Sequence, residues 1–184
     1  MATQLFEVKN GKIEWHPHKF QVQAWASHAR FPIVLKGWRG GFTSSSAKWL
    51  LNEMKRCGPG DLNRSYFAIS PTHQVGGKGL LPAIETVLCT YYQYATYNRS
   101  DHTFTITEEG ERALWGHTQK ERTKIIGCYA ENPESFASMT AIGGVADEIC
   151  QKKFKHNAWT TLRARCSTAS GMVAPNNAGP GLDR

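Results

Sequence analysis

The sequence contains no apolar run approaching the roughly 20 residues that a membrane-spanning helix needs. Its start, MATQLFEVKNGK, also lacks the apolar segment of a secretory signal. Low-complexity segments and internal repeats are absent too. We therefore expect a cytosolic chain without membrane contact. Its 184 residues, 40% of them hydrophobic and 20% charged, suit one soluble globular domain with a sizeable core.

The cysteines are few in number and dispersed along the chain. The five cysteines are Cys57, Cys89, Cys128, Cys150 and Cys166. No C-x-x-C pair occurs among them, and an odd, scattered set in a cytosolic chain indicates free thiols. The seven histidines show neither H-x-x-x-H nor H-E-x-x-H spacing. The sequence therefore predicts neither a disulfide framework nor a zinc site.

Acidic residues are fewer than basic ones, since 15 Asp and Glu stand against 22 Lys and Arg, for a net charge of +7. This balance favours a polyanionic partner such as nucleic acid, through neutralisation of phosphates. The alternative is a soluble protein that happens to be basic, because no dense block of lysine and arginine occurs. The closest approach to such a block is QKKFK, residues 151–155.

Short apolar segments alternate with helical patterns along most of the chain. Strands are predicted at FPIVLK, SYFAIS, KIIGCY, AIGGVADE and GMVAP, which are residues 31–36, 65–70, 124–129, 141–148 and 171–175. Helices are predicted, from apolar residues at helical spacing, over residues 16–29, 43–56, 80–94 and 157–166. This alternation is typical of a mainly parallel α/β sheet with crossover helices, in which ligands bind at the carboxyl ends of the strands.

Two local patterns add detail to this α/β prediction. The helix over 43–56 has a clear apolar stripe, made of Ala47, Leu50, Leu51 and Met54. In the middle of the chain, TFTIT (103–107) alternates apolar and polar residues, and EEGE (108–111) predicts a turn. RALWGH (112–117) can then pair back, so we expect a β-hairpin in mid-chain.

The segment KGWRGGFTSSSAKWLL, residues 36–51, connects the first predicted strand to a predicted helix. Backbone N–H groups of a glycine-rich turn, together with a helix N-terminus, form a cradle for anions. Gly37, Gly40 and Gly41 permit close backbone approach, and Thr43 or Ser44 offers a hydroxyl for Mg²⁺. We interpret the segment as a candidate phosphate-binding loop. The alternative is a plain strand-to-helix turn that needs glycine only for its backbone.

Phe42 stands where a phosphate-binding loop carries its lysine. That lysine reaches the β and γ phosphates as a point charge, and phenylalanine offers no charge. Its loss costs at least the strength of a charge-assisted hydrogen bond, about 1.5–3 kcal/mol. Arg39 lies inside the loop and can substitute in part, because guanidinium is a good phosphate ligand. Lys48, one turn along the helix, is expected to point away.

An acidic pair, Asp147-Glu148, closes the predicted strand over 141–148. Such a pair is the Walker B arrangement, in which the aspartate holds Mg²⁺ and the glutamate polarises the attacking water. An isolated acidic pair is more often a solvated surface, and Gly143-Gly144 makes this strand less apolar than expected. Its place about 100 residues after the loop, in an α/β pattern, favours the functional interpretation.

Two further features fit a nucleotide site but have commoner structural explanations. Gln21 precedes the first predicted strand, and its amide can read an adenine edge, although an exposed helix glutamine is commoner. Arg163 and Arg165 on the last predicted helix are candidates for an arginine finger or for DNA contacts. A solvated helix face is the commoner explanation for such a pair.

A series of segments occurs in one order along the chain: HPHKFQ with Gln21, GWRGGFT, SYFAISPT, AENPESFASMTA, ADE followed by Gln151, and QKKFKHNAWTTLRARCS. The order and the amino-acid sequences of these segments resemble the ATPase part of the large subunit of tailed-phage terminases, the motors that package DNA into procapsids. The resemblance runs from about Trp15 to Val173. Its most specific piece is ENPESF together with D-E-x-x-Q-K-K-F-K.

The resemblance implies an additional-strand P-loop ATPase core that hydrolyses Mg·ATP in a ring of subunits and moves double-stranded DNA. Its partners would be DNA, the terminase small subunit and the portal protein, in the host cytoplasm. Asp147 would hold the magnesium with Thr43, Glu148 would be the catalytic base, and Arg39 the arginine of the loop. The nucleotide would be bound by Gln21, Gly37, Trp38, Arg39, Gly40, Gly41, Phe42, Thr43 and Ser44.

The chain departs from the family at several places, one of which is the Walker B strand, diluted by Ala146 and Gly143-Gly144. Phe42 falls on the lysine position, and the segment APNNAGP lacks the threonines of the family's coupling motif. The chain also ends at Arg184, before the family's nuclease domain. We therefore expect an arm over 1–14 and one ATPase-like domain over 15–184, with impaired hydrolysis. The alternative is a non-hydrolysing nucleotide-fold module that binds DNA or a packaging partner.

Overall fold

A five-stranded sheet is the centre of the computed structural model, which describes residues 5–172 except 11, 28, 30 and 36–40, and only the backbone of 167–172. In spatial order its strands are β4 (Ala95–Asn98), β5 (Thr103–Ile106), β6 (Lys124–Tyr129), β3 (Arg64–Ser70) and β7 (Thr140–Ala146). β3 runs parallel to both β6 and β7, whereas β5 runs antiparallel to β4 and β6. The predicted α/β sheet, parallel at its centre, is confirmed.

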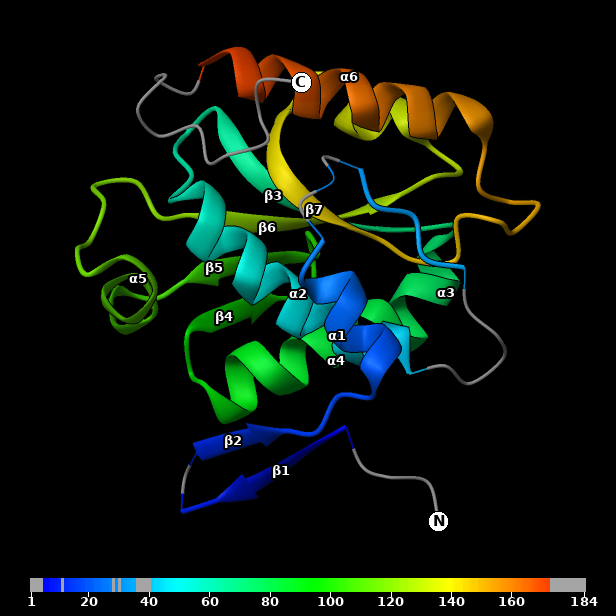
Figure 1. The fold of residues 1–184 in the computed structure, drawn as a ribbon. Helices are drawn as coiled ribbons and strands as arrows, with labels where there is room; N and C mark the ends of the chain where they lie inside the picture. Colours follow the sequence, from blue (N-terminus) through cyan, green and yellow to red (C-terminus); the bar gives the residue numbers. More distant parts are fainter. Residues whose placement is uncertain (1–4, 11, 28, 30, 36–40, 173–184) are drawn as a thin grey trace.

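Helices cover both faces of this sheet (Figure 1). One face packs against α2 (Phe42–Cys57) and α4 (Leu80–Glu85), which continues as a π-helix over Thr86–Tyr91. The other face packs against α6 (His156–Met172). The shorter helices are α1 (Lys19–Trp25), α3 (His73–Lys78), α5 (Glu108–Trp115) and a 3-10 turn over Pro133–Phe136. Within the described ranges, no helix combines the length and the apolar character of a membrane span.

The first residues form a separate hairpin of β1 (Phe6–Lys9) and β2 (Lys12–Trp15). Aromatic contacts attach it to the rest of the chain. The Phe6 ring lies 5.4 Å from the Tyr91 ring, and Trp15 Nε1 donates to the Tyr92 hydroxyl at 3.2 Å. The hairpin therefore packs against the end of the π-helix through its aromatic side chains.

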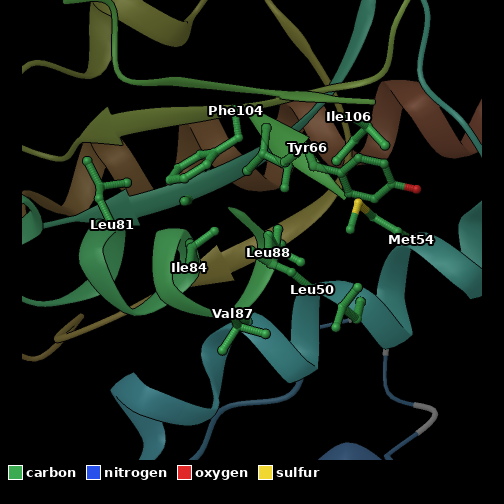
Figure 2. Packing of buried hydrophobic residues seen from close by; sticks show 14 of the residues in the cluster. Leu50, Met54, Tyr66, Leu81, Ile84, Val87, Leu88, Phe104 and Ile106 are labelled. Carbon is green, nitrogen blue, oxygen red and sulfur yellow. The ribbon is translucent and has the colours of Figure 1, made fainter. Parts of the chain in front are cut away.

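Alternation along β3 explains why the sheet has two apolar faces. Tyr66 and Ala68 belong to the core with α2 and α4, whereas Phe67 and Ile69 belong to the core with α6. Figure 2 shows Tyr66 of the sheet packing beside Met54 of α2 and Leu88 of the π-helix. The predicted apolar stripe of α2 is confirmed, because all four of its side chains are buried: Ala47, Leu50, Leu51 and Met54.

The two glycines of β7 lie in close packing, against backbone atoms at Gly144 and against the flexible Glu53 side chain at Gly143. A Cβ at position 144 would lie 2.3 Å from the Phe67 carbonyl oxygen, and one at position 143 would lie 2.8 Å from Cγ of Glu53. Trp49 of α2 also donates to the Gly144 carbonyl at 3.2 Å. The glycines that weaken the strand pattern in the sequence therefore allow β7 to approach its neighbours.

Substituting Gly144 by alanine is expected to destabilise the fold by about 1–3 kcal/mol, because backbone atoms of β3 must move to admit the methyl group. Urea unfolding followed by circular dichroism measures the change. Gly77→Ala is the control, because a Cβ there would have no atom within 4 Å and alanine suits a helix better than glycine. Equal unfolding free energies for Gly144→Ala and the unchanged chain would contradict the packing argument.

The predicted strand FPIVLK (31–36) is wrong for the residues that the structure describes, and Lys36 lies outside them. Residues 32–35 have no regular secondary structure, and Ile33, Val34 and Leu35 are 57%, 41% and 85% exposed. A strand needs a neighbour for its backbone hydrogen bonds, and β7 at the sheet edge pairs only with β3 in the described part of the chain. The apolar composition of residues 31–36 therefore does not by itself make them a strand.

The predicted strand GMVAP (171–175) is also wrong in its described part. Gly171 and Met172 belong to helix α6, and residues 173–175 lie outside the described residues. The helix predicted over 157–166 extends further than expected, because neither proline nor a run of glycine interrupts the chain before residue 173.

The predicted hairpin partner of TFTIT is wrong, because EEGERALW forms helix α5 instead of a turn and a strand. The Thr107 side chain accepts a hydrogen bond from Gly110 N, and Glu108, Glu109 and Glu111 occupy the first turn, where the helix dipole favours acidic groups. The mid-chain hairpin exists but pairs β5 with the preceding β4. Helix α3, which the sequence patterns did not predict, begins with a similar cap by Thr72.

Candidate functional site

The candidate site lies where α2 begins and β7 ends. Gly41 is the N-cap of α2 and has a left-handed backbone with φ 70°, which glycine adopts without strain. Two residues later, the Thr43 hydroxyl donates to Asp147 Oδ2 at 2.6 Å. The structure thus brings together a hydroxyl and a carboxylate that are 104 residues apart in the sequence. This contact joins the two segments that the sequence predicted as one site.

Asp147 and Glu148 leave the end of β7 in a defined geometry. The Asp147 N–H donates to the Ile69 carbonyl at 2.9 Å, and Asp147 Oδ1 accepts from the Glu148 N–H at 3.0 Å. Glu148 has φ 55°, a left-handed conformation that is uncommon for a residue with a side chain. Such backbone strain gathers at functional sites, which supports a role for this residue.

Gln151 contacts Glu148 through its side chain. The sequence patterns did not predict this contact. The amide nitrogen of Gln151 donates to Glu148 Oε2 at 3.0 Å, and its N–H donates to the Glu148 carbonyl at 3.0 Å. The two residues are three positions apart, and that spacing in D-E-x-x-Q is the signal that could have indicated the contact. The bond orients the carboxylate of Glu148.

Gln21 is buried and holds the end of the loop. Its amide oxygen accepts from the His18 N–H at 3.1 Å, and its amide nitrogen donates to the Gly41 carbonyl at 3.4 Å. The first contact closes the start of α1, and the second ties α1 to the N-cap of α2. The amide nitrogen carries a second hydrogen, so contact with an adenine edge stays a prediction.

Phe42 begins α2, and its ring lies half-buried, 6.3 Å from the His18 ring. Its carbonyl accepts from the hydroxyls of Ser45 and Ser46 at 2.9 and 3.1 Å. Ser44 is exposed in the same first turn. The start of α2 therefore presents two hydroxyls, those of Thr43 and Ser44, beside an aromatic ring that carries no charge.

The neighbouring cations have other contacts. Lys48 Nζ lies 5.8 Å from the Trp15 ring centre, and burial lowers the pKa of this ammonium group. Arg163 of α6 lies 5.7 Å from the Phe31 ring. Lys48 thus contacts the hairpin residue Trp15, and its orientation relative to the loop stays a prediction. The remaining predicted loop residues lie outside the described residues: Gly37, Trp38, Arg39 and Gly40.

A groove of about 360 Å³ runs along β7 beside this site. Its walls come from α2, α6 and residues 31–35, and Trp49 and Trp159 are among the apolar side chains that line it. Phe42, Asp147 and Glu148 border the same space. Its size is that of a ligand pocket, but its walls offer few donors for a phosphate. The polar contacts of Thr43 and Asp147 therefore define the candidate site better than the groove.

The donor set of this site suits a hard cation. A hydroxyl and a carboxylate, 2.6 Å apart, are oxygen ligands of the type that Mg²⁺ prefers. The helix N-terminus at Thr43 favours negative charge, since its first N–H groups have no partner within the helix. The arrangement can therefore bind an anion together with its magnesium ion.

Two solved structures share this fold. They are the ATPase domain of the large terminase of Thermus phage P74-26 and an arginine-to-alanine mutant of it, with TM-scores of 0.61 and 0.62. Each is 17% identical to this chain and covers 84% of it. The chain in turn spans 61% and 62% of their length. No protein-family profile and no curated protein sequence matches the chain. The chain thus has the fold of a phage large-terminase ATPase domain.

Proposed function

We propose that the chain is the ATPase domain of a viral DNA-packaging terminase large subunit, with residues 15–184 as one ATPase-like domain. It would couple hydrolysis of Mg·ATP to translocation of double-stranded DNA into a procapsid in the host cytoplasm. The observation that carries this proposal is the hydrogen bond between Thr43 and Asp147, because it joins the loop to the acidic pair. The fold shared with a phage large-terminase ATPase domain supports it.

Each residue of the site has a role in this proposal. Asp147 and Thr43 would hold a magnesium ion, which would supply positive charge to the transferred phosphate. Glu148 orients the attacking water and accepts its proton, and Gln151 keeps that carboxylate in place. Gln21 holds the Gly41 end of the loop that cradles the phosphates. The sequence had already predicted a role for each of these residues except Gln151.

Phe42 impairs this chemistry, because the loop lacks its lysine charge at the β and γ phosphates. Arg39 is the first candidate to compensate, since guanidinium binds phosphate well. We further propose a homo-oligomeric ring during packaging, with the portal protein and the small subunit as partners. These partners follow from the family alone.

Titration calorimetry with ATP tests the proposal. Binding is expected to require Mg²⁺ and to weaken by about tenfold or more in Asp147→Asn, since a charged contact is worth about 1.5–3 kcal/mol. Glu134→Gln, which removes an exposed carboxylate outside the site, is the control and should leave the affinity unchanged. Mg²⁺-dependent affinity that is equal in Asp147→Asn and the unchanged chain would exclude the proposed site.

A catalytically inactive nucleotide-fold module that binds DNA or a packaging partner is the second candidate. Two features support this candidate: Phe42 stands in place of the lysine of a phosphate-binding loop, and the net charge is +7. Under this alternative the titration gives no heat with Mg·ATP. Binding to duplex DNA would then weaken steeply as salt increases, because counterions compete for the phosphates.

A further inference from the structure

Two histidine side chains outside the candidate nucleotide site lie in contact with each other. His73 begins α3 at the carboxyl end of β3, and His102 lies in the turn between β4 and β5. Their Nε2 atoms are 2.9 Å apart, and their ring planes are inclined by 64°. The two residues are 29 positions apart, so only the fold brings these rings together.

His102 is held from several sides. Its backbone is left-handed, with φ 55°, and its carbonyl accepts from the Gly127 N–H at 2.9 Å. Its Nδ1 lies 3.2 Å from the Tyr97 hydroxyl, and the Tyr97 ring is stacked on Phe104 at 4.2 Å. If Nδ1 carries the proton and donates it to Tyr97, the lone pair of Nε2 points at His73. A partner of this kind on the second ring nitrogen is typical of histidines that bind metals.

His73 is held by the neighbouring strand β6 and the residues that follow it. Its N–H donates to Glu131 Oε1 at 3.0 Å, and its ring lies 5.1 Å from the Tyr129 ring. Burial, with a smaller contribution from His73, lowers the pKa of His102 below its usual 6.5.

We propose that His73 and His102 form a two-histidine site for a borderline transition metal such as Zn²⁺, Co²⁺ or Ni²⁺. Imidazole nitrogen suits these metals, whereas Mg²⁺ and Ca²⁺ prefer oxygen. A tetrahedral zinc ion with nitrogen ligands at about 2.0–2.1 Å separates them by about 3.3 Å. The observed distance between the two nitrogens is 2.9 Å, so the rings must move apart by about 0.4 Å to admit the ion.

The site has two protein ligands, and water completes its coordination. Across the described residues, no group of three or more His, Cys, Asp and Glu side chains is arranged for a metal. Bound metal would join α3 to the β4–β5 turn and replace the hydrogen bond between the rings. Its expected effect is a higher melting temperature, because it binds the folded chain and not the unfolded one.

Titration with Co²⁺, followed by its visible absorption, and with Zn²⁺, followed by calorimetry, tests the site. The Cys150→Ser variant is the starting protein, because Cys150 is an exposed thiol and thiols are good ligands for these metals. One metal ion per chain is expected, with affinity that falls as the pH drops and protons compete for the nitrogens. His73→Asn and His102→Asn are expected to abolish this binding, and asparagine tolerates the left-handed backbone at 102.

Two controls separate a ligand from a structural role. His117→Asn removes an exposed histidine elsewhere and should leave binding unchanged. Tyr97→Phe keeps both ligands but removes the partner of His102, and should weaken binding by about tenfold. Nitrogen NMR is applied to the protein that keeps all of its histidines and Tyr97. Zn²⁺ should there change the chemical shift of Nε2 in two histidine rings. Absence of that shift, or equal metal uptake after both histidines are replaced, would show that the rings form a hydrogen bond and no metal site.

Discussion

Phe42→Lys is expected to raise the affinity for Mg·ATP by about tenfold to a hundredfold. The gain corresponds to the about 1.5–3 kcal/mol of a charge-assisted hydrogen bond to phosphate. Position 42 begins α2, directly before the Thr43 that contacts Asp147, so an ammonium group there can reach the phosphates. The fold should tolerate the change, because Phe42 is only half-buried and a lysine stem can pack in its place.

The hydrolysis rate should rise by more than the affinity, because negative charge on the phosphate oxygens is better stabilised in the transition state. Steady-state phosphate release and calorimetry measure the two quantities. Phe42→Met is the first control, since it removes the ring without adding charge. Ser44→Lys is the second, since it adds the charge at an exposed neighbouring position. Neither control should reproduce the gain.

Near-equal rates for Phe42→Lys and the unchanged chain would mean that another group already fills the role of the lysine. Arg39 is then tested directly, because Arg39→Ala should abolish the remaining hydrolysis. Glu148→Gln in the Phe42→Lys background should also lose hydrolysis while it keeps nucleotide binding. Hydrolysis that survives Glu148→Gln would contradict the proposed role of Glu148 as the base.

Glu111→Ala is expected to lower the free energy of unfolding by about 2–5 kcal/mol, because it removes a buried carboxylate that accepts from two backbone N–H groups and from Arg122. Glu111 of α5 is fully buried. Its carboxylate accepts from Arg122 Nη1 and from the Gln119 N–H, both at 2.8 Å, and from the Thr123 N–H at 3.1 Å. Alanine would leave the N–H groups of Gln119 and Thr123 without this acceptor and would leave a cavity, whereas Arg122 keeps its contacts with Glu108 and the Gln119 carbonyl.

Glu109→Ala is the matched control for this prediction. Glu109 stands in the same first turn of α5 but is exposed. Its removal should cost at most about 1 kcal/mol, from the lost interaction with the helix dipole. Urea unfolding of both variants measures the difference. Similar losses for Glu109→Ala and Glu111→Ala would show that burial and the three hydrogen bonds do not stabilise α5.

Several elements of the fold are predictable from local patterns. The stripe of α2 and the short apolar runs of β3 and β6 are correct, because the side chains that an element buries recur with its own period. Asp147 and Glu148 stand directly after β7, where the sequence placed them. Their residue types and position after a strand suffice to nominate them. The roles of these residues remain predictions.

Other features depend on which distant segments become neighbours. FPIVLK has the composition of a buried strand, yet residues 32–35 form none, and among the described residues β7 at the sheet edge pairs with β3 and not with them. EEGERALW forms a helix because Thr107 caps it and β4 already occupies the edge of β5. Local sequence does not encode these pairings.

The chain's order of apolar and polar residues was enough to establish the α/β class, the main helices and the phosphate-loop candidate. The contacts that bring the residues of each candidate site together came from the packing of the sheet. The bond between Thr43 and Asp147 spans 104 residues, and the meeting of His73 with His102 spans 29. Both arise because the ends of neighbouring strands, and the turns beside them, gather at sheet edges whatever their separation in the sequence.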